Sequence, residues 1–147
     1  MAKLRLDFFL ASGPAINLPS VEVNEDGSFD AGRLPPDTYR FVLSGDVGSA
    51  YLESVKVGDS VSHDSLLDLA AAGGNPVLLM LNTRGGEVSG TVQSARDDVP
   101  PPEGATVVLA PDPPNPERYE LYRTATVDSQ GLFQFKGVKP GKYRVYA

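Results

Sequence analysis

An internal repeat constrains this sequence more than any other feature. Residues 21–43 align without a gap onto residues 125–147, at an offset of 104 positions. The identical pairs are turn glycines, a proline, and residues of predicted strands: Val23 and Val127, Gly27 and Gly131, Phe29 and Phe133, Pro36 and Pro140, Tyr39 and Tyr143, and Arg40 and Arg144. Repetition at this spacing indicates one supersecondary unit used twice, so we expect two modules.

The retained residues predict the form of the unit. Residues 24–27 and 128–131 end in glycine, which adopts the positive φ of a hairpin turn without steric cost. Phe29 and Phe133 then begin the returning strands. Each proline precedes a second turn, and the tyrosine after it begins another strand. The repeat predicts strand, turn, strand, turn and strand, with structural roles for the recurring tyrosines.

Glycine and proline punctuation favours an all-β fold for the whole chain. Thirteen prolines and fifteen glycines separate short segments rich in Val, Leu, Phe, Tyr and Thr. In residues 3–8, Leu4, Leu6 and Phe8 alternate with polar residues, which predicts a strand with one buried face. Only residues 64–72 favour a helical turn or two, ended by Gly73.

The repeat divides the chain into two small antiparallel β-sandwich modules, residues 1–84 and 85–147. Further strands are expected at residues 51–57, 66–69, 77–82, 87–93 and 105–110. The first module has no counterpart of strand 87–93, and the second has none of the strands that follow the repeat in the first. We therefore expect a fragment that lacks the first module's opening strand and the second module's closing strands. Unpaired edges of this kind favour self-association by strand pairing.

Charge and composition exclude several classes of protein. The net charge of −6 and the pI near 4.7 oppose binding to nucleic acid, which needs clustered Lys and Arg. The chain has no cysteine, so disulfides and cysteine-ligated metals are excluded. No apolar run is long enough for a membrane-spanning helix or a signal peptide. Any export signal is expected outside this chain.

Candidate catalytic, cofactor-binding and metal-binding residues are not found. The one histidine, His63, lies in a polar loop sequence, and its neighbours in the chain cannot form a catalytic triad. Acidic residues at 24–30 fit a hairpin turn better than a calcium loop. Tyr119 and Tyr122 are the candidates for an alternative function, because exposed aromatic rings can stack on sugars.

Four segments of the second module, which carry its turns and core positions, resemble the carboxypeptidase regulatory-like family, the Cna-B-like or transthyretin-like (prealbumin-like) β-sandwich. They are Gly86–Val92, Pro102–Leu109, Asp128–Phe133 and Val138–Val145. The first module resembles it less, since Asp37 replaces the glycine of the Pro-Gly-x-Tyr turn. The resemblance implies a Greek-key sandwich, common as a spacer in exported bacterial proteins.

These features predict a non-catalytic structural or interaction module of a longer protein that is secreted, at the bacterial cell surface or associated with the outer membrane. Its expected partners are the neighbouring modules of the parent chain, with protein or glycan as further partners. The alternative is a carbohydrate-binding module that uses Tyr119 and Tyr122. A hydrolase is the least favoured class.

Overall fold

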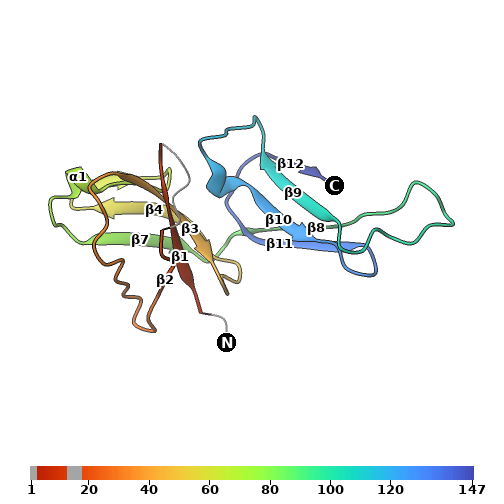
Figure 1. The fold of residues 1–147 in the computed structure, drawn as a ribbon, viewed down its shortest axis with the longest axis horizontal. Coiled ribbons are helices and arrows are strands. Elements are labelled where there is room, and N and C mark those ends of the chain that lie inside the picture. Colours follow the sequence, from red (N-terminus) through yellow and green to blue (C-terminus); the bar gives the residue numbers. More distant parts are fainter. Residues whose placement is uncertain (1–2, 13–17) are drawn as a thin grey trace.

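The computed structural model describes residues 3–12 and 18–147, and its regular structure consists almost entirely of short strands (Figure 1). The strands of residues 3–82 are β1 (Arg5–Leu10), β2 (Val21–Glu22), β3 (Thr38–Ser44), β4 (Tyr51–Val57), β5 (Ser60–Ser62), β6 (Leu66–Asp68) and β7 (Val77–Asn82). Those that follow are β8 (Gly86–Thr91), β9 (Thr106–Pro111), β10 (Arg123–Thr126), β11 (Leu132–Val138) and β12 (Tyr143–Tyr146). The helices are α1 (Leu69–Ala72) and the 3₁₀ turn η1 (Tyr119–Leu121).

The strands form two lobes that lie along the long axis of the molecule (Figure 1). The first lobe, residues 3–82, contains one sheet of order β2-β1-β3-β6 and one of order β5-β4-β7. The second lobe, residues 86–147, contains sheets of order β10-β9-β12 and β11-β8. All the pairings are antiparallel, and the predicted all-β sandwich class is confirmed.

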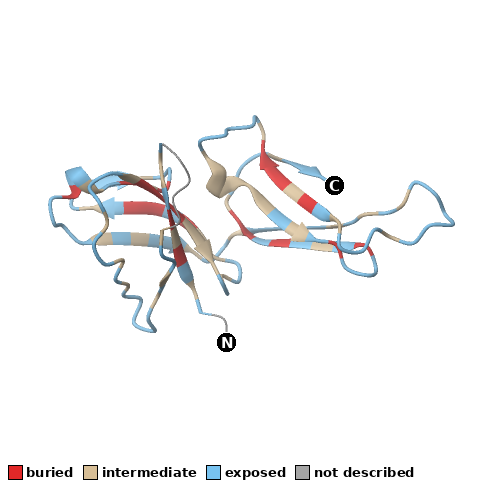
Figure 2. Cartoon of the chain, viewed as in Figure 1, coloured by how far each residue is buried: buried red, intermediate tan, exposed pale blue. Residues whose placement is uncertain are grey.

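Each lobe has its own apolar core, seen as separate buried groups in Figure 2. In the first, Phe8 and Phe41 meet edge to face with ring centroids 4.7 Å apart. In the second, Val107 and Leu109 of β9 are buried beside Phe135 of β11. Both cores draw their residues from alternate positions of facing strands, as half-buried sheets require. The exact division at residue 84 stays a prediction.

The two copies of the repeat have the same strand register. Leu6 pairs with Val21 in the first lobe, and Val107 pairs with Ala125 at the matching place in the second. On the other side of the same strands, the facing pairs are Phe8 with Phe41 and Leu109 with Val145. The sequence repeat therefore corresponds to a repeated three-stranded arrangement, β2-β1-β3 and β10-β9-β12.

The first turn of the repeat is formed alike in both copies. Gly27 and Gly131 each have a φ of 83°, the left-handed conformation predicted for them. The amide of Asn24 donates to the carbonyl of Ser28 at 2.8 Å, and that of Asp128 donates to the carbonyl of Leu132 at 3.0 Å. The predicted glycine turns are confirmed, but they are not hairpins: β10 and β11 pair with different strands, and residues 28–34 form no strand in the first copy.

The recurring tyrosines stabilise the second turn of the repeat through a hydrogen bond. The hydroxyl of Tyr39 donates to the carbonyl oxygen of Pro35, and that of Tyr143 to the carbonyl oxygen of Lys139, both at 2.8 Å. Each bond spans four residues and holds the proline turn against the strand that follows. The predicted structural role of Tyr39 and Tyr143 is confirmed.

The strand predicted to begin at Phe29 is absent. Phe29 does not begin a strand, although its equivalent Phe133 lies in β11. The reason is pairing: β11 bonds to β8, whereas no described strand pairs with residues 28–34. The helical turn predicted within residues 64–72 is confirmed: β6 takes residues 66–68, and α1 begins after Asp68, whose carboxylate caps it, and ends at Gly73.

Replacing Tyr39 by phenylalanine tests the tyrosine bond. Tyr39→Phe keeps the buried ring but leaves the Pro35 carbonyl without its donor, so we expect a loss of about 1 kcal/mol in the free energy of unfolding. Urea denaturation measures it. The control Tyr146→Phe removes a hydroxyl from an exposed side chain and should leave stability unchanged; equal losses in both variants would contradict the role of the bond.

Candidate functional site: the contact between the lobes

Turn η1 of the second lobe packs on the outer face of the first lobe's β2-β1-β3-β6 sheet. The ring of Tyr119 meets that of Phe9 edge to face at 5.4 Å. The Tyr119 hydroxyl donates to the carbonyl oxygen of Leu10 at 3.0 Å. Burial raises the pKa of Tyr119, so the neutral hydroxyl persists as a donor. One aromatic residue thus anchors the second lobe on β1.

A buried ion pair lies beside this anchor. Arg40 projects from β3 on the face opposite to the core and meets Glu120 of η1 with Nη1 and Oε1 3.5 Å apart. Each of the two side chains is only 6% exposed. Arg118 also donates to Glu120, so one carboxylate lies between two guanidinium groups. Removal of these charges from water is costly, and their mutual attraction must offset it.

The hydrogen bonding of the pair is incomplete. Arg40 Nη1 also donates to the carbonyl oxygen of Asp64 at 2.8 Å, and Arg118 Nη1 contacts the Asp64 carboxylate at 3.3 Å. Among the described residues, the buried Nε of Arg40 and Oε2 of Glu120 have no partner. The cluster therefore fixes the position of η1 by ionic contacts from both lobes rather than by a fully satisfied network.

The repeat shows that the contact, and not the strand itself, buries Arg40. Its equivalent, Arg144 on β12, has a side chain that is 63% exposed. Arg144 pairs with Asp112 of its own lobe at 3.1 Å, and this hydrogen bond raises its pKa. At the same position of the repeat, Arg144 is thus a surface residue, because the other lobe does not cover this face of β12.

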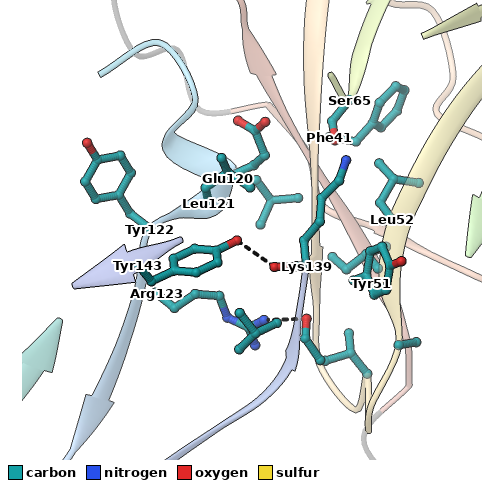
Figure 3. A pocket seen from close by; sticks show the side chains of 16 residues that line it. Phe41, Tyr51, Leu52, Ser65, Glu120, Leu121, Tyr122, Arg123, Lys139 and Tyr143 are labelled. Atoms are coloured by element: carbon teal, nitrogen blue, oxygen red, sulfur yellow. Dashed lines mark hydrogen bonds between the residues drawn. The ribbon is translucent and has the colours of Figure 1, made fainter. Parts of the chain in front are cut away.

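Lys139 adds a second point of contact. Its ammonium group donates to the carbonyl oxygen of His63 at 2.7 Å, across the boundary between the lobes. Burial and the nearby Arg118 lower the pKa of Lys139. Figure 3 shows Lys139 extending from the second lobe towards Phe41 and Ser65 of the first.

Two glycines allow the backbones of the lobes to approach closely at the junction. The amide of Gly85 donates to the carbonyl oxygen of Ser49 at 2.9 Å. A Cβ atom on Gly85 would lie 2.5 Å from that oxygen and 2.7 Å from the Cα of Gly137. A Cβ on Gly137, which has a φ of 65°, would overlap the carbonyl of Ala50. The junction is a packed contact, not a loose linker.

The space left between the lobes is small, and one part of it is a cavity of about 260 Å³ beside the contact of Lys139 with His63. A second cavity, of about 130 Å³, is lined by both lobes, including Tyr51 and Leu52 on one side and Leu121 and Tyr143 on the other (Figure 3). Arg123 closes its floor through a bond of 3.0 Å to the Gly137 carbonyl, and burial lowers the pKa of Arg123. Ligand pockets usually enclose several hundred Å³, so this second cavity fits a few waters rather than a substrate.

The two tyrosines predicted for sugar binding belong to this region. Tyr119 uses its ring and hydroxyl in the contact, as described above. Tyr122 lines the small cavity, and its hydroxyl accepts a hydrogen bond from the Asn115 amide at 3.2 Å. Both side chains are partly buried, which differs from the exposed rings that the sequence suggested.

Other residues considered from the sequence lie apart from one another. His63 is exposed, and the Asp26 carboxylate accepts bonds from the backbone and hydroxyl of Ser28, which lower its pKa. Within residues 3–12 and 18–147, no three His, Asp or Glu side chains gather as a metal site would require. No helix in this part of the chain has the length and apolar character needed to cross a bilayer.

Sequence reasoning missed the ion pair. Arg40 was noticed only as a repeated residue, and Glu120 was not singled out. Their separation of 80 positions gives no local pattern that links them. The signal in the sequence was the position of Arg40 between Tyr39 and Phe41, which places it on the face opposite to theirs but does not show that this face is covered.

The geometry identifies the class of this protein. It is a β-sandwich protein whose two lobes share a buried ionic contact. Residues 83–147, somewhat less than half of the chain, match the family model described as BOS complex subunit NOMO1-like, second beta sandwich domain. This match supports the β-sandwich class for the second lobe. No curated protein and no solved structure matches the chain.

Replacing Glu120 tests the ion pair. Glu120→Gln removes the buried carboxylate between Arg40 and Arg118, so we expect a loss of about 3 kcal/mol in the free energy of unfolding. The matched control is Glu117→Gln, because Glu117 is exposed and lies on the same segment. Urea denaturation followed by circular dichroism measures both, and equal effects would contradict the role of Glu120.

Proposed function

We propose that the chain is a rigid, non-catalytic spacer or interaction module, in which the ion pair between Arg40 and Glu120 fixes the relative orientation of two sandwiches. The buried ion pair carries this proposal. A flexible linker between independent domains needs no desolvated charges at its boundary, whereas a fixed angle needs contacts that only one orientation provides.

Three separate points of contact support a fixed angle. Tyr119 packs on β1, Lys139 bonds to the His63 carbonyl, and Gly85 bonds to the Ser49 carbonyl. They join different elements of each lobe, so rotation about any one of them breaks the others. The few residues between β7 and β8 leave no slack for an alternative arrangement.

The comparison with known families supports a structural or interaction role. The matched domain is described as part of a subunit of a complex, and the description names no reaction. We infer that this chain acts through neighbouring modules of its parent protein or through another protein. The turn motifs of the second lobe support the finer assignment to carboxypeptidase regulatory-like or Cna-B-like modules.

We further propose that the parent protein is exported and works at a bacterial cell surface. The acidic surface and the absence of cysteine support this location. A net charge well below zero also keeps a multi-module chain soluble.

Distance measurements between spin labels test the rigid spacer. The chain has no cysteine, so Asp59→Cys and Gln130→Cys place one label on an exposed loop of each lobe. We expect a narrow distribution of distances by pulsed electron paramagnetic resonance, and a broader one after adding Glu120→Gln. The same labels with Glu117→Gln are the control. A broad distribution in the otherwise unchanged chain would reject the proposal.

Glycan binding through Tyr119 and Tyr122 stays an alternative prediction. It expects a saturable change in tyrosine fluorescence when bacterial cell-wall oligosaccharides are added, lost in Tyr122→Ala. The control Tyr146→Ala removes an exposed tyrosine of strand β12. The spacer function expects no saturable response.

A further inference from the structure

The first lobe has an open apolar groove between residues 28–34 and strand β7. Two adjoining cavities form it, one of about 740 Å³ and one of about 420 Å³. Phe29, Ala31 and Val77 line both, so the groove is continuous along the segment. It is much larger than the space between the lobes and is lined mainly by aliphatic and aromatic side chains.

Strand β7 borders the groove with an edge free for pairing. Among the described residues, β7 pairs only with β4. Leu79 and Leu81 of β7 line the groove, and Leu81 is 38% exposed. An unpaired strand edge beside apolar side chains is a template for another strand.

The second lobe shows how the corresponding space is filled. Residues 28–34 are the repeat equivalents of β11, which pairs with β8. Val88 and Val92, on and just after β8, pack on the second core. Phe135, which faces Val88, corresponds to Ala31 in the first lobe. The first lobe therefore has a groove, and a small residue, where the second has a strand and a phenylalanine.

We propose that this groove binds an extended segment with the residue pattern of β8 as an added β-strand, antiparallel to residues 28–34. The segment resembles β8: it has small or β-branched apolar residues at alternate positions, which enter the groove, and polar residues between them. Backbone bonds to the open edge supply affinity, and the alternate side chains supply selectivity.

Negative charge at one place in the groove favours a basic residue at one position of the bound segment. Gln134 on β11 donates to Glu87 of β8, and the repeat equivalent of Gln134 is Asp30. Asp30 lines the groove together with Glu25. The residue that takes the place of Glu87 therefore faces carboxylates, and a lysine there is favoured.

A peptide titration on the full chain tests the proposal. The probe is an acetylated and amidated peptide with the sequence of residues 86–93, carrying the change Glu87→Lys. We expect saturable binding, followed by amide shifts at residues 28–34 and 77–81 in nuclear magnetic resonance spectra, with slower hydrogen exchange of the β7 amides. The unchanged peptide, with Glu87, should bind about threefold more weakly.

Two variants of one strand locate the binding. Leu81→Lys places a charge in the groove and should weaken binding about tenfold, since it removes apolar contact. Met80→Lys is the matched control, because Met80 is exposed and does not line the groove. No saturable binding, or equal weakening by both variants, would overturn the proposal. A dimer in light scattering whose β7 amides are protected without peptide would also overturn it, because a second copy would then occupy the groove.

Discussion

The arrangement of the two lobes depends on one carboxylate. Glu120 lies between Arg40 and Arg118, shielded from water, and only the observed docking of η1 on β3 brings these three charges together. Such a cluster adds little net stability over an apolar contact, but it penalises every arrangement that separates its members. Its main physical effect is therefore on the choice of orientation, which a spacer needs more than it needs additional stability.

Comparison of the two copies of the repeat distinguishes the interactions that stabilise one sandwich from those that join it to the other. Tyr39 and Tyr143 make the same bond to a carbonyl four residues earlier, so this bond belongs to the sandwich. Arg40 and Arg144 occupy the same register but differ in exposure, so burial of Arg40 belongs to the contact between lobes. The arginine at this position of the repeat therefore has a different role in each lobe, set by what surrounds it.

Much of the fold could be predicted from the sequence, because its signals are local. The glycine turns, the alternation of Leu6 and Phe8, and the strands at residues 51–57 and 77–82 follow from short patterns. The failures have a common cause. Whether residues 28–34 become a strand depends on a partner strand, and whether an arginine is buried depends on a lobe 80 residues away. Neither condition can be inferred from the residues that lie nearby in the sequence.

The shared register of the two copies has a consequence for folding. Similar strands in one chain compete for each other's partners, so a non-native pairing of β1 with β12 is a hazard of such repeats during folding. Side-chain volume opposes the exchange. Phe8 faces Phe41 while Leu109 faces Val145, so one swapped pair would be underfilled and the other overcrowded. Unequal core sizes thus let each copy of the repeat select its own strand as the chain folds.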